Sequence, residues 1–251
     1  MSISYTNEAG VAELVIDCPP VNALDVAGWN GLAESLRKLG ADPSVRVVIL
    51  AAEGRGFCAG VDIKELERLG SGALIGVNRA CFDAFAAVYE CEVPVIAAVH
   101  GFCLGGGIGL VGNADIIVAS SDASFGLPEV DRGALGAATH LSRMVPQHKM
   151  RAMVYTSARA SAAELHAYGS VLKVVERPAL RAAARELAHE IAKKSPTVIR
   201  AAKQSLNGID PIDVRKSYRY EQGFTYELHV SGVADEARKA FVEKREARFD
   251  K

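Results

Sequence analysis

The sequence lacks long apolar runs and any strong net charge. No stretch approaches the roughly 18 to 20 apolar residues that a membrane-spanning helix needs, and Met1–Tyr5 lacks the basic and then apolar pattern of a secretory signal. The 251 residues carry 29 basic and 30 acidic side chains, so the net charge is −1. Such a balance gives no overall attraction to nucleic acid or anionic lipid. We therefore predict a cytoplasmic protein that acts on a small molecule, with no membrane or nucleic-acid partner.

Paired cysteines and closely spaced histidines are also missing. The five cysteines form an odd set without a C-x-x-C pair, which excludes a disulfide framework and a zinc site of that type. The six histidines show no H-x-x-H spacing, so we expect no metal. Cys58 and Cys103 lie in glycine-rich segments, but no histidine adjoins either one, and small buried cysteines are common packing residues. We expect reduced thiols and no catalytic cysteine.

The first half of the chain alternates strand and helix patterns. Apolar composition is 49%, enough for one large domain with a sizeable core. Apolar, β-branched runs indicate strands at 11–17, 45–51, 95–99 and 116–119, and helical spacing of apolar residues indicates helices at 26–39 and 74–89. This order predicts the α/β class, built from ββα or βα units with parallel pairing.

Beyond about residue 135 helix patterns dominate, apart from a strand pattern at 171–175. Ser161 with Glu164 forms a capping box, and Ser195 precedes a proline at a first helical position. Amphipathic patterns at 213–230 and 234–248 need a surface to cover them, either the core or a neighbouring subunit. We therefore predict a core of residues 1–195 and a helical extension of residues 196–251.

Two glycine-dense segments, 55–62 and 100–109, each follow an apolar run and lead into a helix pattern. Glycines at the start of a helix let a ligand approach the backbone, where free N–H groups can donate to it. Two such segments can hold one oxygen between two amides, and losing one donor typically costs roughly 3 kcal/mol. The glycines could instead serve turns and packing alone, and a phosphate loop is disfavoured because neither segment has its pattern. We predict an enzyme that stabilises an oxyanion.

Two carboxylates follow the 116–119 strand at a spacing of two residues, Glu129 and Asp131. In extended or turn backbone this spacing directs both side chains to one side, so they could share a cleft as acid and base. Alternatively both are surface groups, with Asp131 paired to Arg132 or Arg143. His140, further along, is a candidate that could reach the same cleft.

With these residues the chain resembles the enoyl-CoA hydratase/isomerase family, also called the crotonase superfamily, over nearly its whole length. The resemblance depends on five segments in order: 20–24 (PVNAL), 57–65 (FCAGVDIKE), 94–107 (PVIAAVHGFCLGGG), 125–129 (FGLPE) and 240–245 (AFVEKR). It implies a spiral of ββα units with a helical C-terminal region. It also implies an acyl-CoA substrate, no further cofactor, and trimers or pairs of trimers assembled partly through residues 196–251.

The resemblance also implies roles for individual residues. The oxyanion amides correspond to Val61 and Gly106. Coenzyme A would be bound by residues of two segments: Ala23, Ala59, Asp62, Ile63 and Lys64. Hydratases of the family carry two glutamates, and here one is Glu129 whereas the other position holds Gly109, which argues against ordinary hydration. Asp131 is the local candidate for a second carboxylate, and a shorter turn after Gly133 suggests a reshaped acyl pocket.

Residues 126–141, Asn113 and residues 221–226 further resemble one subgroup of the family, hydrolases that open a ring of a bicyclic indanedione carboxyl-CoA in bacterial steroid degradation. This implies a retro-Claisen hydrolysis in which Glu129, helped by Asp131, activates water. The alternatives are an isomerase using Glu129 alone, a hydratase working through Asp131, or a non-catalytic acyl-CoA or RNA-binding member. RNA binding is disfavoured because basic pairs such as 193–194 have acidic neighbours.

Overall fold

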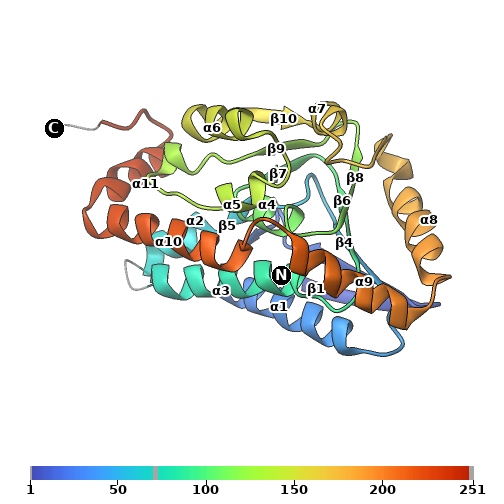
Figure 1. Cartoon of the computed structure of the whole chain (residues 1–251). Helices are drawn as coiled ribbons and strands as arrows, with labels where there is room; N and C mark the ends of the chain where they lie inside the picture. Colours follow the sequence, from blue (N-terminus) through green and yellow to red (C-terminus); the bar gives the residue numbers. More distant parts are fainter. Residues whose placement is uncertain (1, 70–72, 249–251) are drawn as a thin grey trace.

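A six-stranded sheet forms the centre of the part of the chain that the computed structural model describes, residues 2–69 and 73–248 (Figure 1). The strand order is β1 (Ser2–Glu8), β2 (Val11–Asp17), β4 (Val47–Ala52), β6 (Val95–Val99), β8 (Ile116–Ser120) and β11 (Lys173–Val175). β1 and β2 pair antiparallel, and all the other neighbours pair parallel. β4 and β6 are buried along their whole length, as expected for strands covered on both faces.

Helices cover both faces of this sheet. Alternate residues of β4 divide between two apolar clusters, with Val48 and Leu50 in one and Val47 and Ile49 in the other. The first cluster includes residues of α1 (Val26–Ala41) and α3 (Ala73–Tyr89), which pack against each other. The second includes residues of α8 (Leu180–Ala192), which crosses β4, β6 and β8 on the other face.

Two smaller sheets bring the glycine segments together. β7 (Phe102–Leu104), β9 (Ser124–Gly126) and β10 (Arg159–Ser161) form one, and β3 (Ala23–Leu24) pairs with β5 (Gly60–Val61) in the other. Cys58 and Cys103 form an additional bridge between the two glycine segments. The alternating order of strands and helices and the parallel pairing confirm the predicted α/β class.

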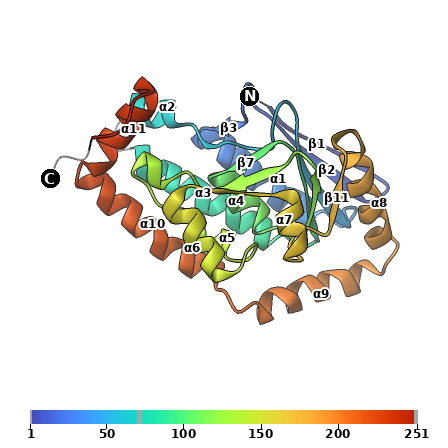
Figure 2. The ribbon, with the colours of Figure 1, turned by 90° about the horizontal axis from the view of Figure 1, so that it is seen from above.

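Most of the remaining helices lie around the sheets, whereas α4 (Gly106–Val111) is buried in the middle of the molecule (Figure 2). The others are α2 (Ile63–Leu69), α5 (Ala138–Leu141), α6 (Gln147–Thr156), α7 (Ala162–Ala167), α9 (Pro196–Ile209), α10 (Val214–Val230) and α11 (Val233–Glu243), with 3-10 turns η1 (Val130–Arg132) and η2 (Arg177–Ala179). Ser161 caps α7 as predicted, because its Oγ accepts from the N–H of Glu164. Lys203 is buried and pairs with Asp115 at 2.7 and 2.8 Å, which fastens α9 to the sheet.

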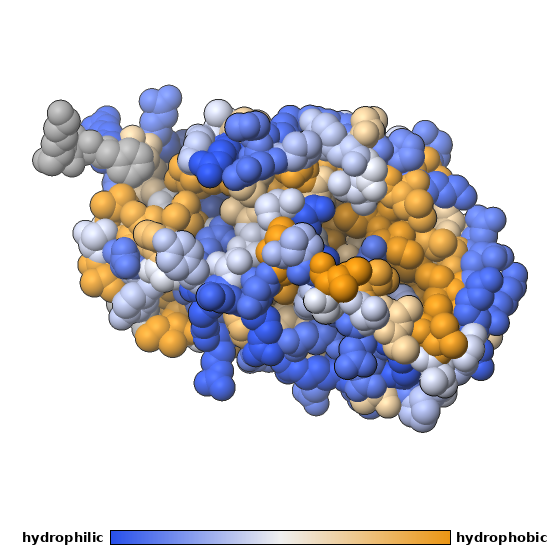
Figure 3. All heavy atoms as spheres, viewed as in Figure 1, coloured by the Kyte–Doolittle hydropathy of each residue, from blue (hydrophilic) through white to orange (hydrophobic). Residues whose placement is uncertain are grey.

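The C-terminal helices differ in part from the sequence-based expectations. The last helix is shorter than the predicted 234–248 and ends at Glu243, where Lys244 adopts a positive φ. α10 lies against α3 and α5, and α11 lies against η1, so residues 214–243 pack on the core of their own chain. Apolar side chains remain exposed among charged ones on the side that carries α9, α10 and α11 (Figure 3). Within the described ranges no helix is both long and apolar enough to span a bilayer.

Candidate active site

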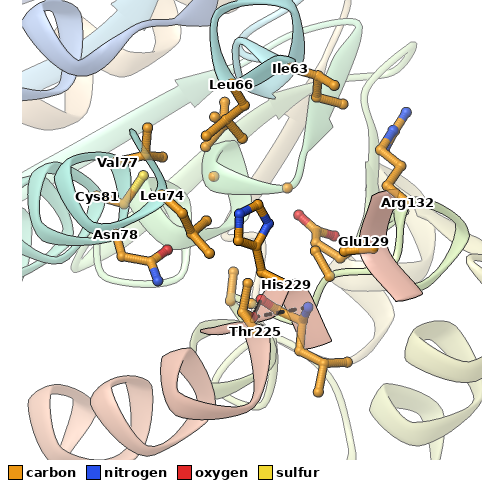
Figure 4. A pocket seen from close by; sticks show the side chains of 18 of the residues that line it. Ile63, Leu66, Leu74, Val77, Asn78, Cys81, Glu129, Arg132, Thr225 and His229 are labelled. Carbon is orange, nitrogen blue, oxygen red and sulfur yellow. Dashed lines mark hydrogen bonds between the residues drawn. The ribbon is translucent and has the colours of Figure 1, made fainter. Parts of the chain in front are cut away.

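A cavity lies between the glycine segments and the C-terminal helices. It encloses about 920 Å³ of empty space, its open mouth included, and is lined by residues of β5, α2, α3, α4, the turn around η1, α10 and α11. Much of the lining is aliphatic or aromatic, including Leu66, Leu74 and Val77 (Figure 4). An apolar cavity with a few polar groups is typical of a small-molecule site.

One wall of the cavity is made of backbone, and we call Val61, Gly105 and Gly106 the backbone wall. Gly60, next to it, has φ +93°, and a Cβ there would lie 2.9 Å from the nitrogen of Gly106. A Cβ on Gly105, where φ is +56°, would lie 2.6 Å from Oε1 of Glu129. The close approach of these segments therefore requires glycine. The fold brings together three predicted residues, Val61, Gly106 and Glu129, around one cavity.

Glu129 is the carboxyl group of this cavity. It follows β9 and directly precedes η1, and its Oε2 is buried without a hydrogen-bond partner. Burial raises the pKa of Glu129 from 4.5 to about 8; the charge of Glu221 also raises it, whereas Arg132 opposes the shift. A carboxyl group that titrates near neutral pH, with a free oxygen in a cavity, is suited to accept and return a proton.

Asp131 does not share the cavity with Glu129, so the predicted common cleft is wrong. The backbone from 130 to 132 is a 3-10 turn rather than extended, and each residue there rotates the side chain by about 120°. Asp131 is exposed and lies outside the cavity lining. Arg143, one of its alternative partners, instead pairs with Asp210 at 2.9 Å.

His140 is also outside the cavity lining, and the expectation that it reaches the cleft is wrong. Its ring is buried, Nδ1 lies 3.1 Å from Oδ1 of Asn113, and the ring packs against Phe85 and Tyr218. Burial and the nearby Arg143 charge lower the pKa of His140 to about 3. A neutral, enclosed imidazole of this kind supports the structure from behind the cavity.

Gly109 has no room for the glutamate that hydratases of the family carry. A Cβ at this position would overlap the ring of Phe85, which itself lines the cavity. Phe85 packs edge-on against Trp29 at 5.5 Å between ring centroids. An aromatic ring therefore occupies the space where a second carboxylate would enter.

Residues of α10 hold the turn after Gly133. Glu221 accepts hydrogen bonds from the N–H groups of Ala138 and Thr139 at 2.8 and 3.2 Å. Thr225 accepts from the N–H of Leu135 at 3.1 Å and also donates to its carbonyl oxygen. This turn lines the cavity, so α10 fixes the shape of this part of the cavity.

A group of polar residues on the C-terminal helices also lines the cavity and was not predicted from the sequence: Thr225 and His229 from α10 and Arg238 from α11, which we call the side-chain wall. Arg132, from η1, also lines the cavity and lies 4.4 Å from the ring centroid of Phe241. Thr225 and His229 are four residues apart in a predicted helix, so helical spacing was the available signal.

The residues expected to bind coenzyme A lie at or near the backbone wall. Ala59 and Ile63 line the cavity. Ala23 pairs with Gly60 through β3 and β5, and Oδ1 of Asp62 accepts from the N–H of Lys64 at 3.0 Å. Their contacts with the coenzyme stay predictions.

Neither thiol chemistry nor a metal has a visible basis here. All five cysteines are buried, and burial raises the pKa of the Cys58 thiol to about 12. A thiol with such a pKa is not a ready nucleophile. In residues 2–69 and 73–248 no three side chains of His, Cys, Asp or Glu are grouped so that they could hold a metal ion.

Comparison with known proteins agrees with this geometry. Residues 6–251 match the model of the family described as "Enoyl-CoA hydratase/isomerase", and the chain belongs to this family. A solved enoyl-CoA hydratase/isomerase from Pseudoalteromonas atlantica T6c superposes with a TM-score of 0.89 at 27% identity, over 100% of both chains. This confirms the predicted crotonase fold.

Two relatives are much more similar in sequence. One from Mycobacterium tuberculosis (strain H37Rv) is 61% identical over 96% of this chain and 98% of its own. Another, from Rhodococcus jostii (strain RHA1), is 58% identical over 96% of this chain and 93% of its own. Both are named (7aS)-7a-methyl-1,5-dioxo-2,3,5,6,7,7a-hexahydro-1H-indene-carboxyl-CoA hydrolase.

Proposed function

We propose that this enzyme hydrolyses a carbon–carbon bond in a bicyclic diketone carboxyl-CoA, the substrate class in the names of its 58% and 61% identical relatives. The observation that carries the proposal is the free Oε2 of Glu129, held in a largely apolar cavity beside the backbone wall.

In the proposed reaction the Glu129 carboxylate takes a proton from water, whose oxygen attacks a ring ketone. The tetrahedral intermediate collapses to a carboxylic acid, and the electrons of the broken carbon–carbon bond move into the conjugated thioester. The N–H groups of Val61 and Gly106 would stabilise the negative thioester oxygen. The proton held by Glu129 then returns to carbon, which completes the addition of one water.

Coenzyme A would enter as part of the substrate, along Ala23, Ala59 and residues 62–64, and no metal or redox cofactor would be needed. We further propose a cytoplasmic trimer or pair of trimers in which residues 196–251 extend a core of residues 1–195. The exposed apolar side chains on α9 and α10 support such an assembly.

A double-bond isomerase that uses Glu129 alone is the second candidate. One carboxyl group is enough to move a proton between two carbons, and the site has only one in contact with the cavity among the residues described. Hydration is disfavoured because Phe85 fills the space at Gly109. Parallel assays with crotonyl-CoA and a 3-enoyl-CoA separate these activities from hydrolysis.

The decisive experiment is turnover of the bicyclic diketone thioester in water labelled with ¹⁸O, followed by mass spectrometry. We expect one label in the new carboxyl group. Glu129→Gln should lower kcat by about 10²- to 10⁴-fold, the range of general base catalysis, whereas Glu186→Gln, at an exposed position of α8, should not. An unlabelled product, or a fully active Glu129→Gln variant, would contradict the proposal.

A further inference from the structure

His229 is a buried polar residue of the cavity that the proposed reaction has not used. It lies on α10, one helical turn after Thr225, and only 8% of the residue is exposed. Its Nε2 is buried without a hydrogen-bond partner. Figure 4 shows its imidazole entering the cavity that Glu129 also enters. Buried polar atoms are normally satisfied, so a free one in a cavity indicates a ligand atom.

The other nitrogen of His229 defines the tautomer. Nδ1 lies 2.6 Å from Nη1 of Arg238, and Arg238 is itself paired with Asp235 one turn earlier on α11. A guanidinium group can only donate, so Nδ1 must accept. A neutral ring that accepts at Nδ1 carries its proton on Nε2, the atom in the cavity.

The surroundings also keep the ring neutral. Burial is the main cause that lowers the pKa of His229, and the charge of Arg238 adds to it, while Asp235 acts in the opposite direction. The cavity therefore combines a proton acceptor, Glu129, with a neutral N–H donor from another part of the chain.

Hydrolysis of the carbon–carbon bond next to a ring ketone requires stabilisation of two oxygens at different stages. The ketone oxygen becomes negative when water adds, and the thioester oxygen becomes negative when the carbon–carbon bond breaks. In the proposed function the amides of Val61 and Gly106 donate to the thioester oxygen. The ketone oxygen is then left without a donor.

We propose that the Nε2–H of His229 donates a hydrogen bond to the ring ketone oxygen that water attacks, so that His229 selects acyl groups with a ketone at this place. This inference rests on the proposed function. When water adds, the π electrons of the C=O bond move onto the oxygen facing His229, and the water proton goes to Glu129. When the C=O bond re-forms, the carbon–carbon bond breaks. His229 keeps its proton throughout, and Arg238 is a positioning residue.

Kinetics of two variants test the donor. His229→Phe keeps a ring but removes the N–H, and we expect about a 10²-fold loss of kcat/KM with the bicyclic diketone, as for other single oxyanion donors. His229→Gln restores an N–H donor at similar reach and should recover at least tenfold over the phenylalanine variant. His189→Phe, at an exposed position on α8, is the matched control. Wild-type kcat/KM in His229→Phe, or no recovery in a folded His229→Gln, would overturn the proposal.

Binding separates a failure of this inference from a failure of the proposed function. Calorimetry should compare CoA thioesters of a bicyclic acid with and without the ring ketone. We expect His229→Phe to weaken binding of the ketone at least fivefold more than binding of its ketone-free analogue. An equal effect on both overturns the role of His229 even if the wild type is an active hydrolase. If the wild type gives no labelled product, but His229→Phe still weakens binding of the ketone more than binding of its analogue, then the proposed reaction is wrong and the role of His229 in binding stands.

The tautomer has its own readout. Long-range ¹H–¹⁵N spectra of histidine-labelled protein at pH 7, with the signal assigned by its loss in His229→Gln, should show a neutral ring protonated on Nε2. Arg238→Gln should alter this signal, because a neutral amide can present its carbonyl to Nδ1. A wild-type ring protonated on Nδ1, or charged, overturns the proposal.

Discussion

In the proposed function the two walls of the cavity supply hydrogen-bond donors by different means. The backbone wall, Val61, Gly105 and Gly106, offers main-chain groups at the junction of short strands and a helix. The side-chain wall, Thr225, His229 and Arg238, offers groups whose positions depend on how α10 and α11 pack. The backbone wall is held by pairing between the two glycine segments and by glycines at close approach, while the side-chain wall depends on how the side chains of α10 and α11 pack. Substitutions should therefore affect the two walls differently.

Of the substitutions that compare the two walls, the largest effect is expected from Gly60→Ala, which would break the backbone wall. The new Cβ would meet the nitrogen of Gly106 at 2.9 Å, so the amides of Val61 and Gly106, the proposed oxyanion donors, must separate. We expect kcat to fall by about 10²- to 10³-fold. Gly169→Ala is a matched control because Gly169 also has a positive φ, +83°, but open space around it. Both variants should lose stability from backbone strain, and only Gly60→Ala should lose activity. Equal activities of Gly60→Ala and Gly169→Ala would show that the backbone wall does not position the oxyanion donors.

Glu129→Gln should change how stability depends on pH, by several kcal/mol at most. The pKa of Glu129 is about 8 in the folded protein, against 4.5 for the free carboxyl group. The contribution of this group to the stability of the fold is therefore fully present below pH 4.5 and is lost as the pH rises to 8. Each unit of this window is worth about 1.4 kcal/mol. Urea unfolding at pH 4.5 to 8.5 should show the glutamine variant gaining on the wild type as pH rises. A constant difference would contradict the raised pKa.

The side-chain wall should respond to Thr225→Val with a smaller, mainly structural loss. Valine keeps the shape but removes both hydrogen bonds to Leu135, at a cost of about 1 to 3 kcal/mol. We expect a lower urea midpoint and a raised KM, with kcat less affected. Thr156→Val is the control, since Thr156 is exposed and bonds only within α6. An unchanged KM would show that the turn after Gly133 does not shape the acyl site.

The smallest effect is expected from Asp131→Asn. Asp131 is exposed and outside the cavity, so kcat/KM should stay within about twofold of the wild type. A tenfold loss would show that Asp131 acts on the substrate in spite of its position in this chain. Comparison with Glu129→Gln therefore isolates the carboxyl group that, among the described residues, lines the cavity.

The sequence was sufficient where local patterns decide the structure. The strand at 11–17, the helix around 74–89 and the cap at Ser161 lie where apolar spacing and capping predict them. β1 was missed because it is mostly exposed and largely polar, so it lacks the apolar alternation of a half-buried strand. Its pairing with β2, rather than its own composition, makes it a strand.

The contrast between sequence patterns and three-dimensional packing also explains which residues of the candidate site could be predicted. Val61, Gly106 and Glu129 were assigned from motifs in the sequence, and strand pairing between their segments brings them together. Asp131 was misplaced because its spacing was interpreted for an extended or turn backbone, and one 3-10 turn reverses the outcome. His229 could not be assigned from its neighbours in sequence, since its role depends on Arg238 and on the packing of α10 against the core.

The ring of Phe85 beside Gly109 limits how this site can change in evolution or in the laboratory. Phe85 also contacts Trp29, His140 and Tyr218, so moving it would disturb several aromatic neighbours at once. A glutamate introduced alone at position 109 would therefore clash with the ring of Phe85 and could not add a second carboxylate to the site. Recovering a two-carboxylate site requires a smaller residue at 85 first, and the order of the two steps is fixed.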